Sequence, residues 1–136
     1  MVRVYMDGIF DLFHRGHIEA VKKCLNFGDE IIIGLVSDQD AQIYKRLPII
    51  GENDRLEILK NIKLVKEIIF PCPLIITKNF IIKNKIDIIV HAFNNESDYE
   101  KQKDFFQIPI KMGIFRKISY YTPISTTSII NKIKLN

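Results

Sequence analysis

The chain has 136 residues, enough for one domain of ordinary size with a buried core. Its hydrophobic content of 47% is typical of a globular protein and excludes a disordered chain. The net charge is a modest +4 with no block of like charges, so we expect no nucleic-acid partner.

The first part of the chain predicts a short strand followed by a helix. The apolar run at 2–6 is typical of a strand. Residues 16–27 have helical spacing, with Ile18, Val21 and Leu25 on one side of the predicted helix. The glycine that follows is expected to end it.

Two strands and a helix are predicted next. Residues 30–36 form a continuous apolar run, the pattern of a strand buried on both faces of a sheet. A polar connection over 37–45 leads to a helix over 52–62, and residues 65–70 predict the third strand.

The last part of the chain continues the alternation of helices and strands. Thr77 is a suitable N-cap for a helix over 78–84, and residues 87–91 predict a fourth strand. Residues 94–97 are expected to be a loop before a helix over 98–106. The chain then ends with a strand over 117–121 and a helix over 125–133.

This alternation predicts the fold class. Strands that alternate with helices form a parallel sheet with helices on both faces. We therefore predict one doubly wound, Rossmann-like α/β domain over residues 1–136, with a central parallel sheet of about five strands. In such sheets ligands bind at the carboxyl ends of the strands. His14, His17, Lys45 and His91 follow or end predicted strands, so all are expected at that edge.

The segment between the first strand and the first helix carries the clearest chemical signal. His14 and His17 are three residues apart, with Gly16 between them at a strand-to-helix turn. The beginning of a helix exposes backbone N–H groups to an anion, and glycine lets a bulky anion approach the backbone. Both imidazoles can donate to one phosphate, so the pattern indicates chemistry at a nucleotide phosphorus.

Several motifs occur together in a characteristic order. They are Gly8–Asp11 (GIFD), His14–His17 (HRGH), Lys45 after the second strand, Arg55 in a helix opening, and Ile124–Thr127 (ISTT). This set resembles the cytidylyltransferase branch of the H-x-G-H nucleotidyltransferase superfamily. The likeness covers nearly the whole chain and is strongest to the catalytic domain of choline-phosphate cytidylyltransferases.

The resemblance implies a reaction. A phosphomonoester oxygen attacks the α-phosphorus of CTP and pyrophosphate leaves, so CMP passes to choline phosphate and gives CDP-choline for phosphatidylcholine synthesis. His14, His17 and Lys45 would be the catalytic residues. Magnesium is implied as an ion that arrives with CTP, and the sequence contains no ligand cluster for a resident metal.

The resemblance also implies two sets of binding residues. The residues expected to bind the nucleotide are Gly8, Ile9, Phe10, Asp11, Gly16, Arg55, His91, Ile124, Ser125, Thr126 and Thr127. The residues expected to bind the acceptor phosphomonoester are Asp7, Lys45, Ala92 and Phe93. Structural roles are the alternatives for three of them: a strand-end residue for Asp7, a helix cap for Asp11 and an ion pair for Arg55.

This chain departs from the choline-phosphate family at several positions. Tyr120 and Pro123 stand where the family has its signature arginine and glycine before the last helix. Leu74 stands where the family has the tryptophan of its choline cage. Ala92 and Phe93 stand where the family has two acidic residues after the fourth strand. The cage that holds a quaternary ammonium through cation–π contacts is therefore incomplete.

These departures leave alternative functions open. Ethanolamine phosphate is the nearest alternative acceptor, because Gly28-Asp29 and the missing tryptophan are more typical of enzymes that use it. Glycerol-3-phosphate is a third acceptor, and Phe93 or Tyr99 could offer a substitute ring face for choline. A catalytically inactive CTP-binding dimer module is the alternative from another class.

Partners and location complete the expectations. The resemblance implies a homodimer formed around Arg3–Tyr5, and the chain ends before any membrane-binding regulatory helix of the family. Cys24 and Cys72 lack C-x-x-C spacing, and neither a signal peptide nor a membrane-spanning run is visible. A cytoplasmic location is therefore expected.

Overall fold

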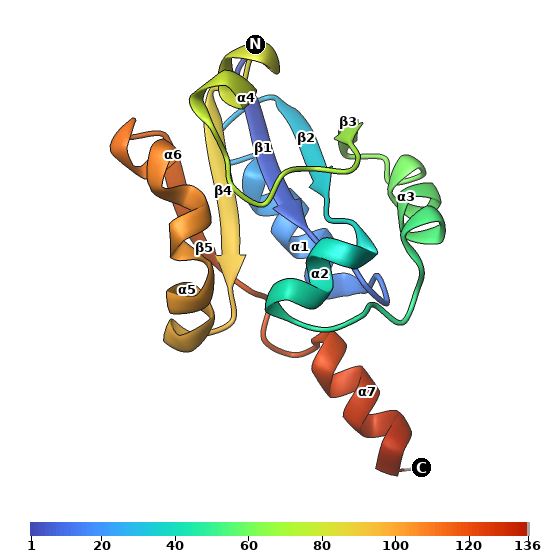
Figure 1. Cartoon of the computed structure of the whole chain (residues 1–136). Helices are drawn as coiled ribbons and strands as arrows, with labels where there is room; N and C mark the ends of the chain where they lie inside the picture. Colours follow the sequence, from blue (N-terminus) through green and yellow to red (C-terminus); the bar gives the residue numbers. More distant parts are fainter. Residues whose placement is uncertain (136) are drawn as a thin grey trace.

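A five-stranded parallel sheet forms the centre of the computed structural model, which describes residues 1–135. Residue 136 of the predicted domain lies outside the described part. The order β3-β2-β1-β4-β5 reverses direction at β1, as in a doubly wound sheet (Figure 1). The strands are β1 (Arg3–Gly8), β2 (Glu30–Leu35), β3 (Val65–Ile69), β4 (Ile88–Phe93) and β5 (Phe115–Ser119).

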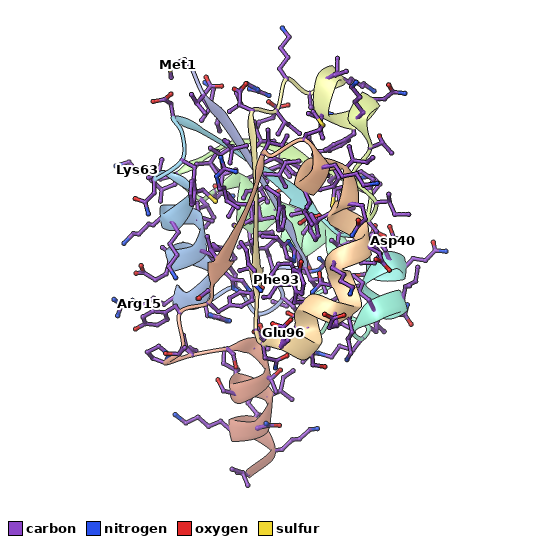
Figure 2. The ribbon with its side chains drawn as sticks, turned by 90° about the vertical axis from the view of Figure 1, so that its left-hand side faces the viewer. Met1, Arg15, Asp40, Lys63, Phe93 and Glu96 are labelled. Carbon is purple, nitrogen blue, oxygen red and sulfur yellow. The ribbon has the colours of Figure 1, made fainter. Side chains whose placement is uncertain are left out.

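Helices connect the strands on both faces of the sheet, which confirms the predicted Rossmann-like class. Figure 2 shows α1 and α5 on opposite sides of the sheet, with Phe93 between them. The helical segments are α1 (Arg15–Cys24), α2 (Asp38–Tyr44), α3 (Glu52–Lys60), α4 (Lys78–Lys83), α5 (Glu96–Gln102), the 3-10 segment η1 (Lys103–Phe106), α6 (Gln107–Lys111) and α7 (Thr126–Leu135).

Two hydrophobic clusters pack against the two faces of the sheet. On one face Val21 of α1 and Leu59 of α3 pack against β1 and β2 side chains such as Ile33. On the other face Ile81 of α4 and Phe106 of η1 pack with β-strand residues. Because both faces of the central strands are covered, their apolar runs are continuous, as the sequence predicted.

The first helix presents a different side to the core from the one predicted. The structure buries Ala20, Val21 and Cys24, whereas Leu25 is 45% exposed. The helix ends at Cys24, three residues before the end of the predicted helix over 16–27. The side of α1 that faces the core includes His17 and the small side chains of Ala20 and Cys24, which were not part of the predicted apolar side.

A helix, α2, occupies the segment expected to be a polar connection over 37–45. Ser37 caps it by accepting a hydrogen bond from the Asp40 N–H at 3.1 Å. Ala41 packs with Val36 and Cys72, which is the small apolar contact that holds this short helix. One buried alanine gives too weak a periodic pattern to be recognised in the sequence.

The segment after β4 also differs from expectation. Asn95 caps α5 by accepting from the Asp98 N–H at 2.9 Å, so the helix begins at Glu96, inside the expected loop. The predicted helix over 98–106 continues as η1, and α6 follows it. Pro109 is tolerated in α6 because it lies in the first turn.

The segment expected at a dimer contact lies mostly inside the domain. Val4 and Tyr5 are fully buried, and Arg3 pairs with Glu30 and Glu67 within the chain at 3.0 and 2.9 Å. The homodimer stays a prediction. Within residues 1–135, every helix falls short of the length and apolar character that crossing a bilayer requires.

The last helix leaves the body of the domain at the carboxyl ends of β1 and β4. Figure 1 shows α7 extending away from this edge, with the N-terminus at the opposite end of the molecule. In Figure 2, Arg15 at the start of α1 and Glu96 at the start of α5 lie at the same edge. The beginnings of three helices therefore surround the carboxyl edge of the sheet.

Candidate active site

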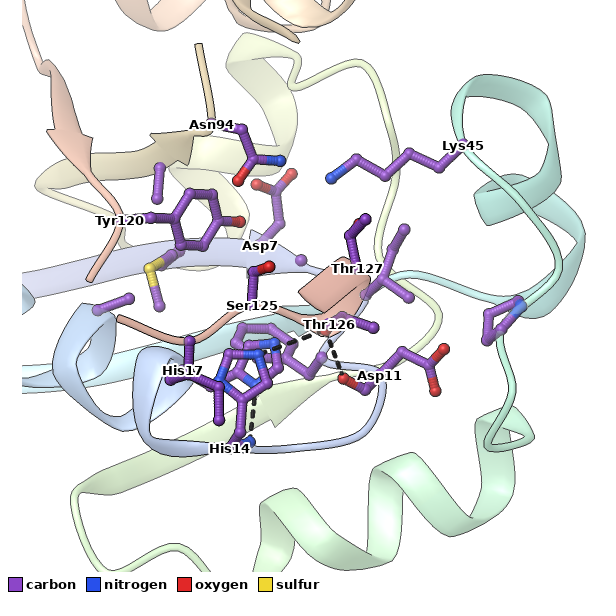
Figure 3. Close-up of a pocket in the computed structure, with 18 of the residues that line it drawn as sticks. Asp7, Asp11, His14, His17, Lys45, Asn94, Tyr120, Ser125, Thr126 and Thr127 are labelled. Carbon is purple, nitrogen blue, oxygen red and sulfur yellow. Dashed lines mark hydrogen bonds between the residues drawn. The ribbon is translucent and has the colours of Figure 1, made fainter. Parts of the chain in front are cut away.

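A cavity of about 410 Å³ opens at this edge, between the ends of β1 and β4 and the beginning of α7 (Figure 3). It contains most of the site residues predicted from the sequence. The lining residues are Met6, Asp7, Gly8, Ile9, Phe10, Asp11, His14, His17, Ala20, Lys45, Arg46, Pro48, Ala92, Asn94, Asn95, Tyr120, Ile124, Ser125, Thr126 and Thr127.

The turn after β1 is held by a carboxylate that bonds to backbone. Phe10 and Leu12 adopt left-handed backbone conformations, with φ of 55° and 49°. Residues other than glycine rarely adopt such conformations. The buried Asp11 carboxylate accepts N–H groups from Leu12 at 3.0 Å and from Ile49 and Ile50 at 2.8 and 2.9 Å. Asp11 therefore orients the turn and ties it to the loop before α3.

The two predicted histidines form a reciprocal cap at the start of α1. The Gly16 N–H donates to His14 Nδ1 at 2.9 Å, and the His14 N–H donates to His17 Nδ1 at 3.0 Å. Because each Nδ1 accepts, each neutral ring carries its hydrogen on Nε2. Their ring centroids are 4.0 Å apart, so the cap sets two Nε2–H donors side by side at the cavity.

Burial keeps these rings neutral. Burial is the main cause that lowers the pKa of His17 to about 3, and the neighbouring His14 and Lys45 contribute to this shift. Burial also lowers the pKa of His14. His17 lies between the rings of Phe10 and Phe13, at centroid distances of 5.6 and 5.1 Å, which exclude water from it. Near neutral pH, therefore, the pair donates hydrogen bonds without carrying charge.

The beginning of α7 is attached to this pair. The Thr126 hydroxyl donates to the Asp11 carbonyl oxygen at 3.0 Å and lies 3.4 Å from His14 Nε2 (Figure 3). The Ser125 hydroxyl accepts the Ser128 N–H at 3.0 Å, as expected of an N-cap. We refer to His14, His17, Ser125, Thr126 and Thr127 as the histidine end of the cavity.

The opposite side of the cavity is the lysine end, formed by Asp7, Lys45, Asn94 and Tyr120. Figure 3 shows the Lys45 ammonium extending from the end of α2 toward Asp7 and Asn94. Desolvation lowers the pKa of Lys45, although its side chain keeps contact with solvent. Burial raises the pKa of Tyr120 to about 12, so its hydroxyl remains a proton donor.

Asn94 and Asn95 line the cavity but are not among the predicted site residues. The predicted fourth strand ends at His91, whereas β4 continues to Phe93. Asn94 is thus the first residue after the strand, at the carboxyl end where a ligand is expected. A correct strand boundary would have identified it.

Arg55 is a correction to the predicted nucleotide-binding set. Its side chain is fully buried, and it lies outside the cavity lining. The guanidinium donates to the carbonyl oxygens of Ile9, Ile50 and Val36 at 2.6, 2.9 and 2.9 Å, and to Asp38 at 2.7 Å. These bonds use all three nitrogens of the fork, so Arg55 supports the turn and the loop from within the fold.

Three other predicted residues also lie outside the lining. The Gly16 N–H donates to His14, and a Cβ at position 16 would lie 2.6 Å from the His14 ring. His91 is buried, with its nitrogens on Asp7 and Gln102 at 2.7 and 3.0 Å. Phe93 packs against Phe106 in the core. The structure thus places these three residues behind the cavity wall, where they support lining residues.

The described residues form no preassembled metal centre. Residues 1–135 contain no group of three or more His, Cys, Asp or Glu side chains arranged to bind a metal ion. Both carboxylate oxygens of Asp11 accept backbone N–H groups, and Asp7 Oδ1 is hydrogen-bonded to the His91 ring. These residues fit an ion that arrives with its own phosphate ligands better than one held by the protein alone.

The role of Arg55 makes a prediction about stability. Arg55→Met removes four hydrogen bonds and leaves buried carbonyl groups unpaired, so we expect the free energy of unfolding to fall by about 3 kcal/mol. Urea denaturation measures this change. Arg15→Met is the control, since that side chain is 69% exposed, and it should change stability by less than about 0.5 kcal/mol. Equal stability of both variants would contradict the structural role.

Comparison with known proteins points to one family. The profile of the family described as Cytidylyltransferase-like matches residues 5–132. Ethanolamine-phosphate cytidylyltransferase of Arabidopsis thaliana is 32% identical over 138 residues, covering 98% of this chain and 32% of that protein. Choline-phosphate cytidylyltransferase A of Homo sapiens is 31% identical over 136 residues, covering 97% of this chain and 36% of that protein. The chain therefore spans about a third of the length of these relatives.

A solved structure is similar in both fold and sequence. The lipopolysaccharide core biosynthesis protein from Thermoplasma volcanium superposes with a TM-score of 0.70 at 30% identity, covering 89% of this chain and 98% of that one. The family profile extends from β1 into α7, and so includes every element that lines the cavity. On these grounds the chain belongs to the cytidylyltransferase-like family.

Proposed function

We propose that this chain transfers CMP from CTP to the phosphate of a small phosphomonoester and releases pyrophosphate. One observation carries the proposal: the reciprocal cap sets the Nε2–H groups of His14 and His17 side by side at a cavity that also contains the beginning of α7 and Lys45. Neutral donors, helix N–H groups and an ammonium are the groups that a reacting polyphosphate requires.

The chemistry requires positioning and charge stabilisation. An oxygen of the acceptor phosphate forms a bond to the α-phosphorus of CTP, and the bond from that phosphorus to the bridging oxygen of pyrophosphate breaks. His14 and His17 would donate to the α-phosphate as negative charge develops on it. Because both rings are already oriented by the cap, these donors need little reorganisation.

The two ends of the cavity suit the two substrates. At the histidine end, the hydroxyls of Ser125 and Thr127 and the N–H groups of Thr126 and Thr127 would hold the outer phosphates of CTP. At the lysine end, the flexible Lys45 ammonium would reach both the acceptor phosphate and CTP. Tyr120 supplies a neutral hydroxyl where the family resemblance leads us to expect an arginine, so one positive charge is replaced by a hydrogen-bond donor.

We also propose that CTP brings a magnesium ion with it. When bound, the ion would screen the negative charge of the triphosphate. The protein would contribute Lys45 and the N–H groups of α7, since the described residues lack a ready-made metal centre. The homodimer remains part of the proposal on the strength of the resemblance alone.

The acceptor has two candidates. Choline phosphate is the acceptor predicted from the sequence, and choline-phosphate enzymes are among the relatives. A quaternary ammonium makes no hydrogen bonds and needs aromatic faces. Phe93 and Tyr99 do not supply such a face, because the chain's own Lys117 ammonium lies 4.1 Å from the Tyr99 ring centroid and 5.9 Å from that of Phe93.

Ethanolamine phosphate is the second candidate, and the residues of the lysine end favour it over choline phosphate. The Asp7 carboxylate, Asn94 carboxamide and Tyr120 hydroxyl can all accept hydrogen bonds from a primary ammonium. Leu74, at the position of the family tryptophan, packs with Val36 and Cys72. Relatives named ethanolamine-phosphate cytidylyltransferase are consistent with this choice.

An acceptor assay tests the proposal. The protein is incubated with CTP, magnesium and either ethanolamine phosphate or choline phosphate, and pyrophosphate release is measured. We expect kcat/KM for ethanolamine phosphate to exceed that for choline phosphate roughly tenfold, because only the primary ammonium satisfies the polar groups. A preference for choline phosphate would reverse the candidates. CTP binding with no pyrophosphate from either acceptor or from glycerol-3-phosphate would leave an inactive module.

Two variants of one histidine test the donor role. His17→Asn retains an oxygen near the position of Nδ1 for the His14 N–H but has no group at Nε2. We expect kcat to fall on the order of 10²–10³-fold, with the melting temperature nearly retained. His17→Gln extends an amide N–H to the Nε2 position and should fall only roughly tenfold. Equal losses in both variants would show that the Nε2–H donor is not what the reaction uses.

A further inference from the structure

A buried hydrogen-bond chain connects the lysine end of the cavity to α5. Asp7 Oδ1 on β1 lies 2.7 Å from His91 Nδ1 on β4, and His91 Nε2 lies 3.0 Å from Gln102 Oε1. Gln102 Nε2 then donates to Asp98 Oδ1 at 2.7 Å. All four residues are at most 9% exposed. Of the four, only Asp7 lines the cavity, so His91 can act on a ligand only through it.

The direction of each hydrogen bond follows from its last member. Asp98 accepts the Gln102 amide on Oδ1 and the Asn94 N–H on Oδ2 at 3.0 Å, as a carboxylate does. Gln102 must then present its carbonyl oxygen to His91, because its amide group points to Asp98. An acceptor facing His91 Nε2 requires a hydrogen on that nitrogen.

The other nitrogen of the ring determines the charge. Asp7 Oδ1 lies 2.7 Å from Nδ1, a distance that requires a hydrogen between the two atoms. With Nε2 already protonated, the Asp7–His91 pair holds one proton more than a carboxylate beside a neutral imidazole. The hydrogen-bond count therefore gives the pair no net charge, as in an imidazolium next to a carboxylate. The rings of Phe93 and Phe106, at 4.8 and 4.6 Å, flank the His91 ring.

We propose that Asp98 and Gln102 are positioning residues that keep the Asp7–His91 pair electrically neutral, and that they thereby set the headgroup selectivity of the lysine end. The proposal rests on the proposed function, because the selectivity concerns the acceptor phosphomonoester. A neutral pair attracts a cationic headgroup less than a lone carboxylate does. The charge that an acceptor meets at Asp7 is thus determined from α5, on the far side of His91.

The hydrogen-bond chain predicts what its reversal does. In Asp98→Asn, the substituted amide can donate to Gln102, which then turns its carbonyl oxygen toward position 98. Its amide group would face His91 Nε2, which must become an acceptor. The ring keeps one hydrogen on Nδ1 for Asp7, and the pair gains a charge of about −1. In the double variant Asp98→Asn with Gln102→Glu, the carboxylate at 102 accepts from both neighbours and restores the neutral pair.

Nitrogen-15 NMR of the His91 ring at neutral pH tests the protonation directly. We expect two ring N–H groups in the parent protein, a single Nδ1–H in Asp98→Asn, and two again in the double variant. The control Asp104→Asn, at an exposed carboxylate in η1, should leave the His91 signals unchanged. A single ring N–H in the parent protein would overturn the proposal, and so would a second N–H retained in Asp98→Asn.

A second variant applies if Asp98→Asn does not fold. Gln102→Met keeps the volume of the side chain but removes the acceptor at Nε2, so it should also leave His91 with a single Nδ1–H. Gln107→Met is its control, because Gln107 is exposed and bonds only to the Lys103 carbonyl oxygen at 3.3 Å. Two ring N–H groups in Gln102→Met would contradict the proposed dependence.

Kinetics test the selectivity. The ratio of kcat/KM for ethanolamine phosphate to kcat/KM for glycerol-3-phosphate compares a cationic with a neutral headgroup. We expect this ratio to rise roughly tenfold in Asp98→Asn, because the negative charge lost at Asp98 reappears at the Asp7–His91 pair, which meets the acceptor through Asp7, and to return in the double variant. An unchanged ratio together with an altered His91 ring would overturn the selectivity claim. If no variant releases pyrophosphate, the proposed function fails, while the NMR result still decides the protonation of the pair.

Discussion

The reciprocal hydrogen bonds between His14 and His17 are the interaction on which the rest of the site depends. Each imidazole uses Nδ1 to satisfy a backbone N–H at the start of α1, a group that every helix must satisfy somehow. The same contacts fix the tautomer, so both Nε2–H groups face the cavity, where their only contact among the described residues is the long one of His14 Nε2 with the Thr126 hydroxyl at 3.4 Å. Folding of the first helix and preparation of two phosphate donors are therefore one event, and burial keeps both rings neutral.

Charged residues around this pair are used largely to hold backbone. The Asp11 carboxylate binds three N–H groups, and the Arg55 guanidinium binds three carbonyl oxygens. Together they stabilise the left-handed turn at Phe10 and Leu12 against the loop before α3. Because these charges are engaged internally, the cation that extends toward Asp7 and Asn94 at the lysine end is Lys45 (Figure 3). A polyphosphate would thus meet a site whose donors are mostly neutral and already oriented.

Much of the fold could be predicted because β1, β2 and β4 are buried on both faces, which leaves continuous apolar runs in the sequence. The α2 helix could not, since its only buried residue is Ala41. Sequence position also placed the His pair, Lys45 and the Ser125–Thr127 segment correctly at the cavity. It could not distinguish an arginine that faces a ligand from one that binds carbonyl groups, because Arg55 occupies the same helix position in both cases. The partners of His91 are Asp7 in β1 and Gln102 in α5, and long-range side-chain contacts of this kind leave no periodic trace in a sequence.

The histidine cap and the α5 hydrogen-bond chain act on opposite ends of one cavity, and both use hydrogen-bond direction to set protonation. The most direct measurement of the central claim is a ring 15N–1H spectrum of His14 and His17 with and without CTP. The account predicts a single Nε2–H on each ring at neutral pH, and a downfield shift of both Nε2–H signals when CTP binds. A doubly protonated His17, or Nε2–H signals that do not respond to saturating CTP, would contradict it.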